Sequence, residues 1–406
     1  MALLKFGSSI LRDISFPAVV AGFVAVLVGF TSSVALIFQA ARSLGATPGQ
    51  TASWLLALGI GIGFSTILLS IRFRLPVLIA WSTPGAAVIA GAASVGELTL
   101  AQATGAFLVS AALIAITGIS GGFEKIMHRL PLPLASALLA GVLSKFTLDA
   151  FAATPGNPLL LLTMFAVYLT GRAFWPKFHV PVMLVAGIVV ARFQGLFHLE
   201  SVSWSITTPV FVMPEFTVAS IIGVAIPLFV VTMASQNLPG VSVFLAHGYE
   251  PPVSKILTWS GLANLVVAPF GGFSLNLAAI TAAFCMNGEA NPDPGKRYVS
   301  AVFAGLFYLL IGIFGATLAA LFFAFPHELI LAIAGLALLG TIATGLTAAL
   351  KEDGFREAAV VTYFVTLSGI VLVGVGSAFW GIVAGELVLL MKHLATKRTG
   401  NLSRRP

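Results

Sequence analysis

The sequence predicts an all-α polytopic membrane protein with about 14 transmembrane segments, arranged as two inverted repeats of seven. Three observations predict it: the composition, a regular series of apolar segments, and a matched pair of polar interruptions. The chain is 58% hydrophobic and only 9% charged, with a mean hydropathy of +1.04, whereas soluble domains are about 25% charged. This composition excludes a soluble globular domain.

Apolar segments recur along the whole chain at the length that a bilayer requires. Crossing about 30 Å of hydrocarbon takes about 20 helical residues. The candidate segments are 17–41, 50–71, 76–93, 98–121, 132–150, 158–174, 180–197, 217–237, 252–268, 273–287, 297–324, 327–350, 355–374 and 377–395. The first segment is longer than the apolar part of a cleaved signal, which has about 7 to 15 residues, so we expect it to be a retained span.

The basic residues test this segmentation independently. If the amino terminus is cytoplasmic, all but three of the 21 lysines and arginines fall on the cytoplasmic side, and the three exceptions are Arg42, Lys145 and Arg192. Cytoplasmic loops of membrane proteins are enriched in these residues. We therefore expect both termini to be cytoplasmic, and the net charge of +7 does not indicate nucleic-acid binding.

Similar features recur in the same order in both halves of the chain. GFTSSVALIFQAA is followed by the turn 45–48 and the interrupted segment 76–93. IPLFVVTMASQNLPG is followed by the turn 248–252 and PFGGFSLNLAAITAAF. Seven spans is an odd number, so the second copy must be inverted relative to the first. We expect repeats at 1–213 and 214–406.

Polar residues interrupt the third and tenth segments. In PVLIAWSTPGAAVIAG, residues 77–81 are expected to be extended, and Ser82 or Thr83 to cap a half-helix with Pro84 near its first position. In the tenth segment, residues 270–273 are expected to be extended and Ser274 to cap a half-helix from Leu275 onward. Two helix amino ends facing each other at the bilayer midplane would form an anion site. The alternative is a pair of kinks whose freed carbonyls are satisfied by neighbouring hydroxyls.

Three motifs carry a resemblance to a known family. WSTPG at 81–85, TMASQNLPGV at 232–241 and PFGGFSLNLAAIT at 269–281 resemble the benzoate/proton symporter family of bacteria. More distantly, the chain is similar to the uracil permease and anion-exchanger superfamily. The resemblance implies a bacterial inner-membrane protein, with a core domain from spans 1–4 and 8–11 and a gate domain from spans 5–7 and 12–14. It also implies pairing into homodimers.

The resemblance also directs attention to the eighth and tenth spans. Nucleobase carriers of the superfamily place acidic or histidine side chains there, whereas this chain has amides and a hydroxyl. A carboxylate in the pocket would repel benzoate, while amides, hydroxyls and backbone N–H groups accept its charge. The candidate substrate-binding residues are Ser82, Thr83, Gly85, Gln236, Asn237, Gly272, Phe273, Ser274 and Asn276.

The aromatic ring of a substrate would need apolar walls, and the candidates are Trp81, Phe273, Leu275 and Phe30. Other polar residues have an ordinary structural interpretation. Gln39 is expected to be an interfacial side chain, and Thr31, Ser32 and Ser33 are expected to bond back to their own helix.

Few groups are available to carry a proton. Glu386 is expected near the cytoplasmic interface, and Lys145 and Asp149 are spaced to neutralise each other on span five. A benzoic acid group titrates much like glutamate, near about 4.3, so the proton could travel on the substrate itself.

These features favour a secondary transporter that imports benzoate with a proton by alternating access. The alternatives are a transporter of another small organic anion or nucleobase-like solute, or a facilitative anion channel. No HExxH or Walker motif occurs in the sequence, and its few ionisable groups are scattered, so we expect no enzyme activity. We also expect neither cofactor nor metal, because the single cysteine, Cys285, and the scattered histidines lack metal-ligand spacing.

Overall fold

The computed structural model describes residues 12–93, 98–123, 131–176, 178–196, 204–279, 281–370, 372 and 377–402. Six of the basic residues used to predict the orientation lie outside these ranges, namely Lys5, Lys125, Arg129, Lys177, Arg404 and Arg405.

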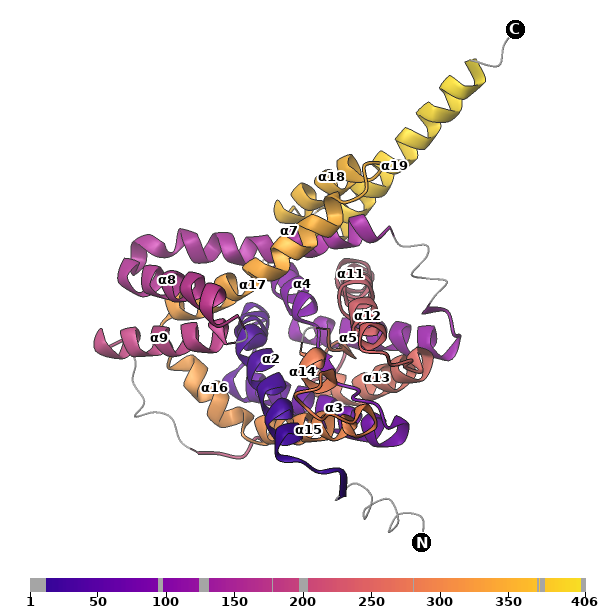
Figure 1. Cartoon of the computed structure of the whole chain (residues 1–406). Coiled ribbons are helices and arrows are strands. Elements are labelled where there is room, and N and C mark those ends of the chain that lie inside the picture. The colour runs from indigo at the N-terminus through magenta and orange to yellow at the C-terminus, as the bar shows by residue number, and fades with distance from the viewer. Residues whose placement is uncertain are drawn as a thin grey trace.

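Helices make up most of the described chain (Figure 1). The first part contains α2 Phe16–Ser43, α3 Pro48–Phe73, α4 Thr83–Ala93, α5 Leu100–Ile119, α7 Leu132–Ala152, α8 Pro158–Phe174 and α9 His179–Phe193. The second part contains α10 Val218–Ser220, α11 Ile226–Thr232, α12 Leu238–Ala246, α13 Val253–Val267, α14 Ala282–Met286, α15 Tyr298–Ile313, α16 Gly315–Phe323, α17 His327–Leu350, α18 Arg356–Leu367 and α19 Ser377–Leu402. The strands are β1 Ile79–Trp81 and β2 Leu275–Leu277.

The helices have the length and composition of membrane spans. Among the described residues, nine helices are long and apolar enough to cross a bilayer, and three shorter apolar helices are Thr83–Ala93, Pro158–Phe174 and His179–Phe193. The structure therefore confirms the all-helical polytopic class. The count of fourteen spans stays a prediction.

Two predicted segments have different bounds in the structure. Segment 297–324 is divided into α15 and α16, and Thr207 forms hydrogen bonds with both helices at the junction. Thr207 donates its N–H to Ile313 O at 2.9 Å, and its Oγ1 accepts from Ala316 N at 2.7 Å. Segment 355–374 is represented by α18, which already ends at Leu367.

Hydroxyl residues fix where several helices begin. Thr47 caps α3 and Thr99 caps α5, each in a capping box with the glutamine three residues later. These caps satisfy amide groups that a helix end leaves without intrahelical partners.

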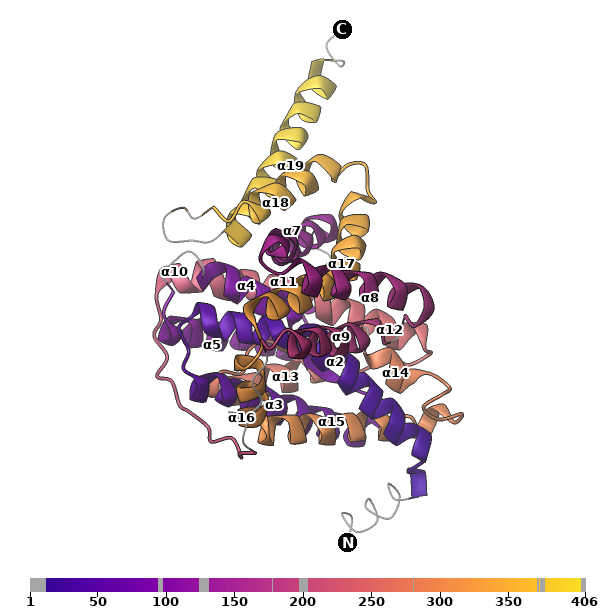
Figure 2. The same cartoon turned by 90° about the vertical axis from the view of Figure 1, so that its left-hand side faces the viewer.

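The helices pack as two groups. In the first group, α3 packs against α15, α5 against α13, and α2 against α15 and α4. In the second group, α7 packs against α17 and α18, α18 against α19, and α8 against α9. In both views α7, α18 and α19 lie above α3, α13 and α15 (Figure 1, Figure 2). The division into core and gate domains, and the inverted repeat itself, stay predictions.

Glycines in α3 allow a close contact with α15 in the first group. A Cβ at Gly59 would lie 2.6 Å from Tyr308 O, and one at Gly63 would lie 2.7 Å from Gly305 O. Small residues let helix backbones approach in this way. The glycine pattern of α3 therefore serves packing within the chain.

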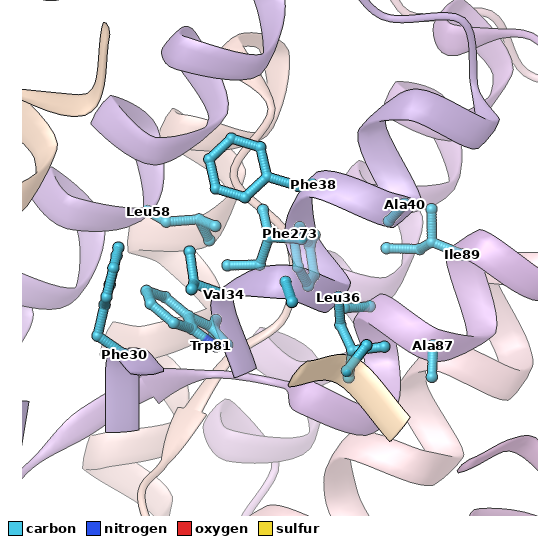
Figure 3. Close-up of a cluster of buried hydrophobic side chains, with 14 of the residues drawn as sticks. Phe30, Val34, Leu36, Phe38, Ala40, Leu58, Trp81, Ala87, Ile89 and Phe273 are labelled. Carbon is cyan, nitrogen blue, oxygen red and sulfur yellow. The ribbon is translucent and has the colours of Figure 1, made fainter. Parts of the chain in front are cut away.

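Buried side chains surround the two strands and continue into the second group, where Leu143 of α7 and Ile333 of α17 belong to the same cluster. Phe30 and Val34 of α2, Leu58 of α3, Trp81 of β1 and Phe273 belong to one buried cluster (Figure 3). This cluster fixes the position of the strands relative to the surrounding helices.

Candidate functional site

The two strands meet in an antiparallel pair inside the first helix group. Ala80 faces Asn276 in the register, with Ile79 opposite Leu277 and Trp81 opposite Leu275. The ladder continues at both ends, since Ser82 N donates to Ser274 O at 3.1 Å and Ala278 N donates to Leu78 O at 2.9 Å. Non-helical backbone at membrane depth requires such internal partners. The pair also brings the two motif regions, almost 200 residues apart in sequence, into contact.

In the first half of the site, Ser82 caps α4. Its Oγ accepts from Gly85 N at 3.0 Å, and Pro84 in the first turn has no N–H to satisfy. Thr83, the first residue of α4, is half-buried. Within the described part of the chain, neither its N–H nor its Oγ1 has a hydrogen-bond partner. The positive end of α4 therefore retains one free amide beside a free hydroxyl.

In the second half, the predicted helix start was wrong. The stretch 270–273 was predicted to be extended. Phe270 instead ends the 3-10 turn Ala268–Phe270, and Gly271 follows in a left-handed conformation with φ 97°. Leu275–Leu277 is strand β2, and the short helix α14 begins only at Ala282. A helix starting at Leu275 would leave the backbone of β1 unpaired in an apolar core, so strand pairing is favoured.

Two oxygen atoms next to β2 have no partner. Ser274 and Asn276 are fully buried, and Asn276 Nδ2 donates to Ser274 O at 2.9 Å. Ser274 Oγ and Asn276 Oδ1 are both buried without a hydrogen bond. Ser274 also has a positive φ of 41°. Unsatisfied polar atoms and a strained backbone are costly and concentrate at functional sites.

The eighth predicted span connects both halves through side chains. Asn237 Oδ1 accepts from Leu277 N at 2.9 Å, and Thr232 Oγ1 donates to Ser82 Oγ at 3.0 Å. The span contains two π-helical segments, Ile221–Ala225 and Met233–Asn237, a type of distortion common at functional sites. Gln236 lies in the second of them, half-buried and without a hydrogen bond to the described residues.

Thr232 was missed in the sequence analysis. It stands within the TMASQNLPGV motif, four residues before Gln236. Its position in that motif was the available signal, but a lone threonine in a helix usually bonds to its own backbone.

The proposed apolar walls are tightly packed in this conformation. Trp81 Nε1 donates to Ser33 Oγ at 2.8 Å, and the ring of Trp81 lies edge to face with Phe30 at 6.0 Å and Tyr308 at 5.7 Å. Phe273 is fully buried and lies 5.8 Å from both Trp54 and Phe107. Leu275 is also fully buried. Phe273 thus faces the rings of α3 and α5.

The two candidate glycines allow close packing of the motifs. A Cβ at Gly85 would lie 2.7 Å from Leu228 Cδ1, and one at Gly272 would lie 2.3 Å from Val267 Cγ2. A larger residue at either position would displace the half-helix or the turn before β2.

The remaining polar candidates are separate from the strand pair, except for Ser33. Thr31, Ser32 and Ser33 bond back to carbonyls of α2, as predicted. Gln39 has a buried Oε1 without a partner.

The three groups considered for proton transfer lie away from the strand pair in sequence and packing. Lys145 and Glu386 are exposed and Asp149 is half-buried. Lys145 and Asp149 form no ion pair in the described structure, so the predicted mutual neutralisation was wrong.

The structure is a polytopic helical fold with paired strands and the start of a short helix at its centre. Solved structures of membrane transporters have this fold. The transmembrane domain of a cyanobacterial bicarbonate transporter, BicA, matches with a TM-score of 0.59 at 14% identity, covering 91% of this chain and 97% of that one. SLC26A9 matches with a TM-score of 0.63 at 12% identity, covering 94% of this chain and 66% of that one. These likenesses concern the fold.

Sequence comparisons are more specific. The family described as "Benzoate membrane transport protein" matches residues 12–391, and the chain belongs to this family. It is 45% identical to "Inner membrane protein YdcO" of Escherichia coli (strain K12), over 94% of this chain and 97% of that protein. It is 36% identical to "Benzoate membrane transport protein" of Acinetobacter baylyi (strain ATCC 33305 / BD413 / ADP1), over 95% and 98%.

Proposed function

We propose that this transporter imports benzoate, or a closely related aromatic carboxylate, together with one proton by alternating access. The observation that carries the proposal is the unpartnered pair of Ser274 Oγ and Asn276 Oδ1, next to the free amide of Thr83. The ladder bond from Ser82 N to Ser274 O, at 3.1 Å, keeps these groups together.

The chemistry of this pair fits a carboxylic acid group. The Ser274 hydroxyl is able to donate a hydrogen bond, whereas Asn276 Oδ1 is a carbonyl oxygen and only accepts. The bond from Asn276 Nδ2 to Ser274 O fixes the orientation of this amide. A protonated carboxyl group has one donor and one acceptor, which is the complement of this pair. The N–H of Thr83 at the positive end of α4 would stabilise residual negative charge.

Proton coupling follows from the energetics of uptake. Moving an anion into a cell with a negative interior costs about 2.3 kcal/mol per 100 mV. A proton carried with it removes this cost. Since benzoic acid titrates near the value of glutamate, about 4.3, a site that binds the neutral acid transfers the proton without a dedicated acidic side chain.

The two packed helix groups supply the moving parts. We infer that the group containing α4 and β2 acts as the core domain and carries the substrate, and that the group containing α7, α17 and α18 acts as the gate domain. Both termini would be cytoplasmic and the protein would reside in the bacterial inner membrane as a homodimer. We infer a closed state of the site from the full burial of Ser274 and Asn276.

The test is uptake of labelled benzoate into proteoliposomes, with the pH gradient and the membrane potential varied separately. We expect saturable uptake that rises with an inward proton gradient. In Ser274→Ala the half-saturation concentration should rise about tenfold, as expected for losing one hydrogen bond to a charged or partly charged group. Stability should not fall, because Ser274 Oγ has no protein partner.

Ser274→Gly is the matched control, because glycine also lacks the hydroxyl but accepts a positive φ freely. An equal rise of the half-saturation concentration in both variants identifies the missing hydroxyl as the cause. Wild-type uptake that ignores the proton gradient would favour the facilitative channel. Uptake of another labelled organic anion or of a labelled nucleobase, without uptake of labelled benzoate, would favour the other alternative.

A further inference from the structure

A cavity of about 260 Å³ lies between the two helix groups, away from the strand pair. One wall comes from the second half of α4 and from Gly223, and the other from α7, α18 and the start of α19. We propose that this cavity is an outer vestibule that binds the carboxylate of the substrate before it reaches the strand pair. This inference rests on the proposed function.

The wall of the cavity carries a positive charge. Lys145 is the one charged side chain among the described residues that line the cavity. It is exposed, and in the part of the chain that the structure describes it forms no ion pair, even with Asp149 one turn away. A cation that is not neutralised within the protein is available to an anionic ligand.

The hydroxyl groups of the wall are not available to a ligand. Thr366 lines the cavity, but its Oγ1 is buried and lies against Gly381 of α19, where an added Cβ would be 2.1 Å from it. The hydroxyls of Ser368 and Ser377 already donate to Val365 O and Thr366 O. Lys145 is therefore the side chain of the described wall that can attract a carboxylate.

The rest of the wall suits an apolar ring. Val88, Val142 and Phe146 supply aliphatic and aromatic surface. A Cβ added at Gly91 would meet nothing within 4 Å, so the α4 side of the cavity is open there. The volume is slightly below the range of small-molecule pockets, which begins at about 300 Å³, and suits a single-ring acid.

The cavity lies where a substrate from outside would bind before it reaches the strand pair. In the predicted topology, α4 runs from the strand pair toward the outer face, and Lys145 is one of only three basic residues on that side. The cavity is bounded by both helix groups, so motion of one group against the other would open or close it. A solute captured there lies along α4, whose opposite end holds Thr83.

The experiment measures benzoate uptake by the full chain in proteoliposomes at several ionic strengths. In the wild type, the half-saturation concentration should rise with salt, because salt screens an exposed charge. Lys145→Gln should raise this concentration at low salt by up to about fivefold, the size typical of one solvated ion pair. Lys145→Gln should also make the half-saturation concentration independent of salt and leave the maximal rate nearly unchanged. Lys145→Arg should behave like the wild type.

A second pair of variants tests the cavity itself. Gly91→Phe should fill the space and lower the maximal rate, whereas Gly91→Ala should not. Wild-type uptake with a salt-independent half-saturation concentration, or an unchanged half-saturation concentration in Lys145→Gln, would overturn the vestibule while leaving the proposed function intact. Absence of any wild-type uptake of benzoate would overturn the proposed function instead.

Discussion

The two halves of the site share a plan but are held in place differently. In the first half, β1 leads directly into α4, an 11-residue helix capped by the adjacent Ser82. In the second half, β2 is separated from α14 by residues 278–281, and α14 has only five residues. The strand β2 depends on Asn237, which lies 40 positions away in sequence.

The difference shows two ways to build a break in a membrane span. The first half is stabilised mainly by residues nearby in sequence, because Ser82 caps α4 and Thr66 Oγ1, 13 positions before Ile79, accepts from Ile79 N at 3.0 Å. The bond from Thr232 to Ser82 is its distant side-chain contact. The second half is stabilised by distant side chains and by a left-handed turn at Gly271. Substitutions that disturb distant contacts should therefore damage the second half more than the first.

The largest expected effect is at Gly271. A Cβ there would lie 1.8 Å from Trp54 Cδ1, and the residue has φ 97°, so Gly271→Ala combines a clash with backbone strain. We expect a loss of about 3 kcal/mol or more, measured as the yield of folded protein and its thermal unfolding midpoint in detergent. Gly49→Ala is the control, because a Cβ at Gly49 meets nothing within 4 Å. Similar yields for both variants would contradict a dependence of the second half on this turn.

A smaller loss is expected at Asn237. Asn237→Leu leaves the buried Leu277 N without the acceptor that it now has at 2.9 Å, and an unsatisfied buried donor costs about 1 to 3 kcal/mol. Denaturant titration of the purified protein measures the loss. The matched variant Gln236→Leu should change stability little, because Gln236 is half-buried and makes no hydrogen bond to the described residues. Equal losses at both positions would refute the assignment of Asn237 as the support of β2.

The smallest effect is expected in the first half. Ser82→Ala removes the cap of α4 and the acceptor for Thr232, which should cost about 1 to 2 kcal/mol. Thr232→Val removes only one of these bonds and should cost about 1 kcal/mol. In the double variant the two losses should not add fully, because they share one hydrogen bond. Full additivity would show that the bond between these hydroxyls contributes nothing.

Sequence reasoning predicted the first half better than the second. Ser82, Thr83 and Pro84 are local signals for a helix start, and the structure begins α4 at Thr83. Ser274 gave the same kind of signal, but the following residues form a strand, since β1 offers them hydrogen bonds. No local pattern could show this, because the partner lies almost 200 residues away. The cavity beside Lys145 was also beyond sequence reasoning, since its walls come from α4, α7, α18 and α19.

Composition and the spacing of apolar segments alone determined that this protein is a helical membrane protein. Every backbone amide in a bilayer needs an internal partner, so apolar segments of this length form helices. These segments can be located in the sequence without a structure. Local caps likewise determined where α4 begins. Only the tertiary structure decided that β2 is a strand, that Ser274 and Asn276 keep free oxygen atoms, and that Lys145 faces a cavity. These properties depend on whether each polar atom finds a hydrogen-bond partner on a distant part of the chain. Such partners come together only after the helices have packed.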